Sequence, residues 1–215
     1  IDQKAMRKIN ADDRLILTEV LTRLYAELDA ESESEANAAT DALLNVGVED
    51  VELGSGEFTY GVEVDWEKLP PGYSWTDAAA VAVDSQDRVY AFQRKDPPII
   101  IFDRQGNFLN SWGNGSFLYA HSIYIEDDII YLTDREGSVA MKYTLDGKPL
   151  QLLGTHGEYS DTGCERAGDL VPRAAGPFNY LTEMVPSPSG DLYVSDGYRN
   201  ARIHRFSGDG QLKQS

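Results

Sequence analysis

Residues 179–214 read NYLTEMVPSPSGDLYVSDGYRNARIHRFSGDGQLKQ. Two apolar residues lead into a turn at Pro188–Asp191, and a β-rich run follows at Leu192–Val194. A polar loop then precedes the alternating residues Ala201–Phe206, which end at a hairpin turn, Ser207–Gly210. Because two-residue alternation and turn residues agree at every step, this stretch predicts antiparallel strands rather than a helix.

The same order of strands and turns occurs twice upstream. The repeats cover residues 77–113, 119–154 and 179–215, and Tyr90, Tyr131 and Tyr193 align them. Repeats spaced by about 40 residues are typical of propellers and solenoids. Each repeat predicts a four-stranded antiparallel sheet, which cannot bury both of its faces alone. We therefore predict a mainly β fold, an incomplete β-propeller of about three blades.

Two parts of the chain do not follow the repeat. Residues 155–178 form an insertion that contains the single cysteine, Cys164, and a long insertion on one face of a repeat array is often part of a binding surface. Residues 1–50 predict a helical hairpin, because apolar residues recur three and four apart from Leu15 to Leu28 and, more weakly, from Glu33 to Asn45. We place the domain boundary at residue 51, which separates segments 1–50 and 51–215.

Composition limits the classes of partner. The formal net charge of −17 argues against nucleic acids and anionic membranes, and no apolar run is long enough for membrane insertion. One cysteine cannot form an internal disulfide, so the cysteine count does not distinguish a periplasmic from a cytoplasmic location. Both ends of the chain look cut, so we expect an exposed sheet face that promotes self-association.

Two resemblances follow from these stretches. The repeats resemble NHL repeats, which form six-bladed propellers. The stretch SDGYRNARIHRFSGDG (195–210) and the opening ELGSGEFTY (52–60) resemble bacterial relatives of peptidyl-α-hydroxyglycine α-amidating lyases. The stretch NADDRLILTEVLTRLYAELDAESESEANAATDALLNVGVE (10–49) resembles the C-terminal end of a solute-binding protein of TRAP-type transporters.

The lyase resemblance implies a site. His121 matches a zinc-binding histidine, Tyr198 matches the tyrosine that helps take the proton of the substrate hydroxyl, and Arg94 matches an arginine that holds the substrate carboxylate. A zinc site needs three or four ligands, and the remaining family histidines would lie in later blades. A tyrosine acts as a base only where a nearby cation or metal favours its phenolate.

Each of these residues also has a structural interpretation. His121 would face the channel and bond to a backbone carbonyl, and Tyr198 would pack over the rim. Arg94 would form a rim ion pair, an interpretation favoured by Arg135 at nearly the same place of the second repeat. The pairs Asp84/Asp87 and Asp127/Asp128 fall in predicted turns; calcium binding is the lesser alternative.

Three functions follow from the sequence. The first is a zinc-dependent lyase that cleaves the N–C bond of an α-hydroxyglycine to give an amide and glyoxylate. The second is a non-catalytic module whose propeller face binds a protein or a small ligand. The third is solute binding for a TRAP-type transporter, carried by residues 1–50 alone.

Overall fold

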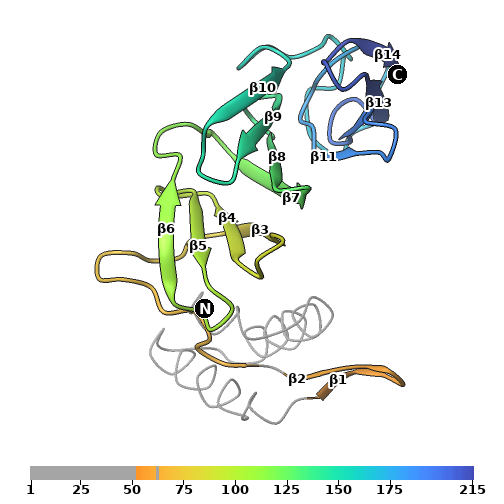
Figure 1. Ribbon diagram of the computed structural model, residues 1–215. Helices are drawn as coiled ribbons and strands as arrows, with labels where there is room; N and C mark the ends of the chain where they lie inside the picture. The colour runs from red at the N-terminus through yellow and green to blue at the C-terminus, as the bar shows by residue number, and fades with distance from the viewer. Residues whose placement is uncertain (1–51, 62) are drawn as a thin grey trace, which may run out of the picture. The chain divides into compact units, whose positions relative to one another are not determined.

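The computed structural model describes residues 52–61 and 63–215, and its regular elements there are β-strands (Figure 1). The predicted helical hairpin and the TRAP resemblance lie outside the described residues and stay predictions. The structure divides into two units, one that ends at Trp66 and one that comprises Glu67–Ser215. The first contains a hairpin of β1 (Glu52–Ser55) and β2 (Phe58–Gly61). The described residues include no helix long and apolar enough to cross a membrane.

The second unit consists of three antiparallel sheets, each with its four strands in chain order. The first sheet contains β3 (Ala78–Val83), β4 (Val89–Gln93), β5 (Ile99–Phe102) and β6 (Phe108–Trp112). The second contains β7 (Ala120–Glu126), β8 (Ile129–Asp134), β9 (Val139–Thr144) and β10 (Pro149–Leu153). The third contains β11 (Glu183–Pro186), β12 (Leu192–Asp196), β13 (Arg202–Phe206) and β14 (Leu212–Gln214). The predictions of a mainly β fold and of four-stranded, blade-like sheets are confirmed.

Glycine closes the turn between the last two strands of each sheet. Gly106, Gly147 and Gly210 have φ angles of 77°, 85° and 93°, a region that residues with a Cβ rarely adopt. The predicted recurrence of a Gly-bearing turn at this place is therefore confirmed. Ala201 also has a positive φ, 52°, so it belongs to the preceding loop, and β13 begins at Arg202 rather than at Ala201 as predicted.

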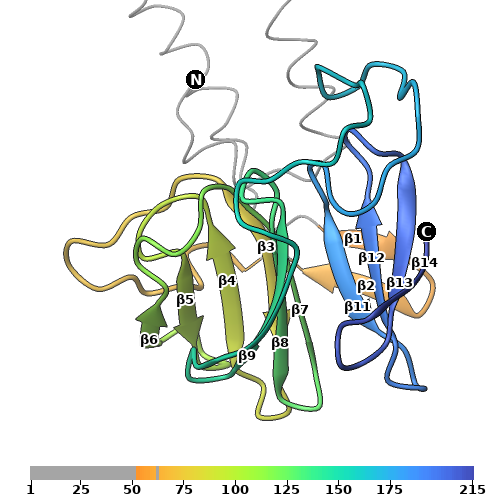
Figure 2. The same ribbon diagram turned by 90° about the horizontal axis from the view of Figure 1, so that it is seen from above.

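The second sheet lies between the first and the third (Figures 1 and 2). One apolar layer lies between each neighbouring pair of sheets. Tyr90 is fully buried between the first and second sheets, and Tyr131 is buried between the second and third. The equivalent face of the third sheet has no covering sheet in the described residues, so Tyr193 and Ile203 are 38% and 61% exposed. Strand alternation thus buries one face of the third sheet and leaves the other accessible.

A polar side chain three positions after each aligned tyrosine ends the second strand and holds the loop that leads into the first strand. These side chains are Gln93, Asp134 and Asp196, all buried. Gln93 accepts a hydrogen bond at Oε1 from Thr76 N (3.1 Å) and donates one from Nε2 to Pro97 O (3.0 Å). An amide suits this place because its two partners are one donor and one acceptor.

Asp134 has only donors around it. Its carboxylate accepts from the backbone N–H groups of Leu118 (2.6 Å), Tyr119 (2.9 Å) and Gly137 (2.8 Å). A Cβ at Gly137 would lie 2.6 Å from Asp134 Oδ2, so glycine is required for this close approach. The carboxylate therefore fixes the backbone of Tyr119, directly before β7.

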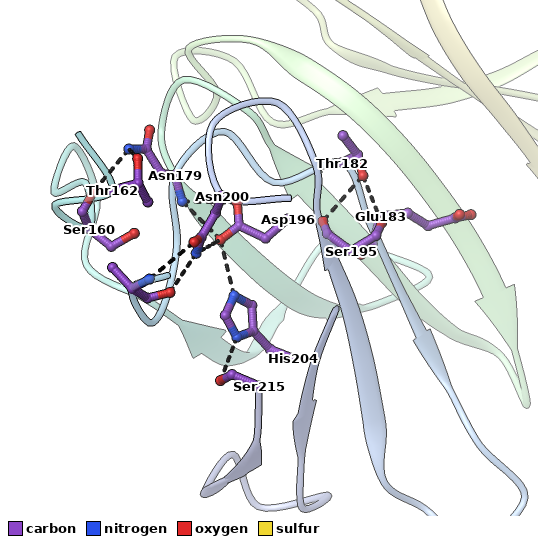
Figure 3. Close-up of polar contacts among 11 residues, drawn as sticks. Ser160, Thr162, Asn179, Thr182, Glu183, Ser195, Asp196, Asn200, His204 and Ser215 are labelled. Atoms are coloured by element: carbon purple, nitrogen blue, oxygen red, sulfur yellow. Dashed lines mark hydrogen bonds and ion pairs between the residues drawn. The ribbon is translucent and has the colours of Figure 1, made fainter. Parts of the chain in front are cut away.

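Asp196 is the centre of the corresponding network in the third sheet (Figure 3). It accepts from Asn179 N (2.9 and 3.0 Å to its two oxygens), Asn200 Nδ2 (2.8 Å) and His204 Nε2 (3.1 Å). His204 is fully buried, and its Nδ1 pairs with the Ser215 hydroxyl at 2.8 Å. Because a carboxylate accepts only, His204 donates from Nε2, and this imidazole is committed to structure rather than free for a ligand.

The insertion is tied to this network. Asn200 donates to Ala175 O (2.7 Å) and accepts from Ala175 N (3.3 Å), and Asn179 donates from Nδ2 to Ser160 O at 2.9 Å. Cys164 is buried within the insertion. Residues 155–178 thus pack against the end of the third sheet from which the Tyr198 loop leaves.

Candidate functional site

The predicted site residues occupy related places at one end of the sheets. Arg94, Arg135 and Tyr198 each follow the second strand of their sheet. The backbone N–H of each donates to a backbone carbonyl in the segment that leads into the first strand of the same sheet. His121 lies in the first strand of the second sheet, at a register shift between Ala120 and Ser122. A bulge redirects one side chain out of the strand alternation, and here that side chain is His121.

The hydrogen bonds of His121 define its tautomer. Nδ1 lies 2.7 Å from Thr182 O, and Nε2 lies 3.2 Å from the hydroxyl of Tyr198. A carbonyl only accepts, so Nδ1 carries the proton and the Nε2 lone pair accepts from Tyr198. The predicted bond of His121 to a backbone carbonyl is therefore present. The same bond is the usual outer contact of a metal-binding histidine, so it agrees with both interpretations of this residue.

The surroundings of His121 favour the neutral imidazole. Burial lowers its pKa, the hydrogen bond to Thr182 opposes this, and the charges of Arg135 and Arg94 lower the pKa further. A neutral ring that carries a lone pair on Nε2 is a form that binds metal ions. The site thus supplies a ligand-ready nitrogen near neutral pH.

Tyr198 meets His121 edge to face. The two ring centres are 5.5 Å apart with an interplanar angle of 76°, and the tyrosine side is the more exposed. The structure therefore brings two of the three predicted site residues within hydrogen-bond distance, from the second and third sheets. Residues that are far apart in the sequence form this pair.

Arg94, the third predicted site residue, does not contact this pair directly. It donates from Nε to Ala120 O (3.2 Å), and its Nη1 lies 3.6 Å from Asp77 Oδ2. Arg94 also lines a cavity of about 210 Å³ together with Lys95, Phe117 and other residues. The lining is mixed, with Asp96 beside the two cations, and a guanidinium in such a cavity can bind the carboxylate of a small ligand.

Arginine and tyrosine side chains alternate along this end of the sheets. The Cζ atoms of Arg94 and Arg135 each lie 3.9 Å from the centre of the Tyr119 ring. Arg135 lies 5.4 Å and Arg199 lies 4.1 Å from the centre of the Tyr180 ring. We call these five residues the Arg–Tyr ladder; its contacts are of the cation–π type. Reasoning from the sequence missed Tyr119 and Tyr180, which precede the first strands of the second and third sheets.

The described residues contain no group of three or more His, Cys, Asp or Glu side chains placed to hold a metal ion. His156 is half exposed in the insertion, and His204 is committed to Asp196. Within this part of the chain, His121 is thus a single zinc-ligand candidate, and a complete zinc site would need ligands from elsewhere.

The aspartate pairs lie in turns, as predicted. Asp127 and Asp128 have φ angles of 51° and 57°, the conformation of a tight hairpin turn. Asp84 accepts from the backbone N–H groups of Gln86 (2.9 Å) and Arg88 (3.0 Å). Burial opposes ionisation of Asp84, but these bonds and the Arg88 side chain lower its pKa overall.

The chain is similar to three curated lyases. It is 29% identical to peptidyl-alpha-hydroxyglycine alpha-amidating lyase 1 of Drosophila melanogaster over 111 residues, 50% of this chain and 18% of that protein. It is 26% identical to a probable lyase of the same kind from Caenorhabditis elegans over 114 residues (53% and 30%). It is 25% identical to lyase 2 of Drosophila melanogaster over 167 residues (65% and 38%). The predicted lyase resemblance is confirmed at this distance, and the chain spans 18% to 38% of its relatives' length.

Two solved structures of lyases are also similar to part of this chain. Virginiamycin B lyase from Staphylococcus aureus matches with a TM-score of 0.45 and 16% identity, over 63% of this chain and 40% of that chain. A streptogramin B lyase structure matches with a TM-score of 0.46 and 15% identity, over 66% and 42%. No protein-family model matches the chain.

Proposed function

We propose that the described sheets belong to a six-bladed NHL-type propeller and carry part of a lyase site for an α-hydroxyglycine. The His121–Tyr198 pair is the observation that carries the proposal, because a hydroxyl and a neutral imidazole meet there. The similarity to three amidating lyases supports the reaction class.

The reaction is an elimination without an external oxidant or reductant. The substrate hydroxyl loses its proton, its C–O bond becomes a carbonyl, the C–N bond breaks, and the nitrogen takes up a proton. The products are an amide and glyoxylate. Tyr198 is the group we assign to the hydroxyl proton, and Arg94 is the cation we assign to the carboxylate.

A bound zinc ion would supply Lewis-acid polarisation of the substrate oxygen. His121 would hold it through Nε2, with Nδ1 oriented by Thr182 O. Because that lone pair now accepts from Tyr198, a metal at Nε2 would displace this hydrogen bond and leave the tyrosine hydroxyl free to face the substrate.

The test is glyoxylate formation from N-acetyl-α-hydroxyglycine by the zinc-supplemented six-bladed protein to which we assign these sheets. Tyr198→Phe should lower the rate by at least about a hundredfold, the scale of a lost acid–base group. Tyr193→Phe is the matched control, because it removes the same hydroxyl from a tyrosine within strand β12 rather than in the loop that brings Tyr198 to His121. Equal rates in both variants would reject the role of Tyr198. Ligand binding without turnover would favour the binding-module alternative.

A further inference from the structure

Arg135 is better placed toward the His121–Tyr198 pair than Arg94 is. Its Cζ lies 5.2 Å from the centre of the Tyr198 ring. Burial lowers the pKa of Arg135, but its contacts with Glu136, Tyr119 and Tyr198 outweigh burial and raise it. The guanidinium is therefore charged and lies against the hydroxyl that we assign to the reaction.

Tyr119 holds this guanidinium in place. Two guanidinium groups cannot both lie 3.9 Å from one ring centre on the same side, so Arg94 and Arg135 cover opposite faces of Tyr119. The ring keeps the two like charges apart and leaves each free to donate from its edge. The Asp134 carboxylate in turn fixes the Tyr119 backbone.

The protein does not satisfy Arg135 fully. Its Nε is buried and has no hydrogen-bond partner among the described residues, whereas Arg94 uses its Nε on Ala120 O. A buried donor without a partner destabilises the fold. A carboxylate that bonded Arg135 through two parallel N–H groups would remove this cost.

A neighbouring carboxylate now occupies Arg135 from the solvent side. Glu136 Oε1 lies 2.9 Å from Nη2, and the Glu136 side chain is 39% exposed. Ion pairs with exposed partners are weak, because water competes for both groups. Glu136 can therefore give way to a ligand at small cost.

We infer that Arg135 is a second carboxylate-binding residue of the site, and that Glu136 is its internal competitor. The ligand class is a small carboxylate with an adjacent amide, and this class rests on the proposed function. Arg94 and Arg135, on the two faces of Tyr119, then offer two guanidiniums to one anion-binding region of a strongly acidic chain.

The probe is N-acetylglycine, which carries the amide and the carboxylate but no hydroxyl to eliminate. We would titrate the full chain by ¹⁵N–¹H NMR and follow the Arg Nε–Hε and backbone signals. Saturable binding is expected, weakened about tenfold or more in Arg135→Gln, the scale of a lost charge-assisted bond. Arg104→Gln is the matched control, because it removes the same charge from an exposed hairpin.

Glu136→Gln gives a prediction of opposite sign. Removing the competing carboxylate should tighten binding several-fold. Because the Glu136 side chain is 39% exposed, we expect this variant to stay folded, and it then tests the inference even if Arg135→Gln unfolds. No saturable binding in the parent chain and in Glu136→Gln, or equal affinity of the parent and Arg135→Gln, would overturn the inference. Binding that Arg135→Gln weakens supports the inference even if the zinc-supplemented six-bladed protein forms no glyoxylate, a result that would reject the lyase proposal. Glyoxylate formation that is unchanged in Arg135→Gln would support the lyase proposal and overturn the inference.

Discussion

Exchanging carboxylate and amide at Asp196 tests the polar networks that close each sheet. Asp196→Asn keeps the shape of the side chain but replaces one acceptor oxygen with an NH₂ group. Oδ2 accepts from Asn179, Asn200 and His204, and Oδ1 accepts from Asn179 alone. The asparagine will therefore place its oxygen at the Oδ2 position and turn its NH₂ toward the Asn179 N–H (Figure 3).

The cost follows from these contacts. One buried donor faces another donor, which costs about 1–3 kcal/mol, and the other two bonds lose their charge assistance, about 1 kcal/mol more. We expect the free energy of unfolding to fall by about 2–4 kcal/mol, a large part of the 5–15 kcal/mol that is usual for a folded domain. Equilibrium urea unfolding followed by far-ultraviolet circular dichroism measures the difference.

The reverse exchange, of an amide for a carboxylate, should also destabilise the fold. In Gln93→Glu, a carboxylate oxygen would face the carbonyl of Pro97, to which the Gln93 amide now donates. Asp209→Asn, in an exposed turn of the third sheet, makes the same chemical change as Asp196→Asn and should cost under about 0.5 kcal/mol. If Asp196→Asn cost no more than this control, the donor-and-acceptor account of the network would be wrong.

Two further predictions concern packing and protonation. Ile99 and Ile203 hold equivalent positions of their sheets, but Ile99 is fully buried and Ile203 is 61% exposed. In urea unfolding, Ile99→Ala should lower the free energy of unfolding by about 2–5 kcal/mol and Ile203→Ala by under about 0.5 kcal/mol. Similar losses in the two variants would contradict the assigned faces. Burial lowers the pKa of His121. Below about pH 6.5 the unfolded chain therefore binds a proton at this histidine more readily than the folded chain does. The free energy of unfolding of the parent chain should then rise with pH through the range just below that value. His121→Gln should flatten this rise in denaturation measured from about pH 5 to 7.5, and parallel profiles of the two proteins would refute the assignment.

The positions of His121 and Arg135 show the limit of reasoning from sequence. His121 and Ala79 hold equivalent places in the second and first sheets, because both lie at a register shift near the start of the first strand. The sequence did not reveal the bulge, because an extra residue in a strand leaves no change in composition. The tautomer of His121 was also unreadable, since its partner, the Thr182 carbonyl, belongs to another sheet.

The structural interpretation of Arg94 was a rim ion pair, because a basic residue, Arg135, recurs at nearly the same place of the second repeat. The ion pairs of Arg94 with Asp77 and of Arg135 with Glu136 exist, but the sequence could not show that Tyr119 separates Arg135 from Arg94. That contact depends on how the first and second sheets stack, and stacking is decided by side-chain packing across the interface.

The sequence by itself determined the strands, their turns and their grouping into three sheets of four, because alternation and turn chemistry act over a few neighbouring residues. It also aligned Gln93, Asp134 and Asp196 through a fixed distance from each tyrosine. Only the tertiary structure decided which polar type suits each of these places, and that the Nε2 lone pair of His121 meets the hydroxyl of Tyr198. Those outcomes depend on donors and acceptors that distant segments bring together, and no local pattern encodes them.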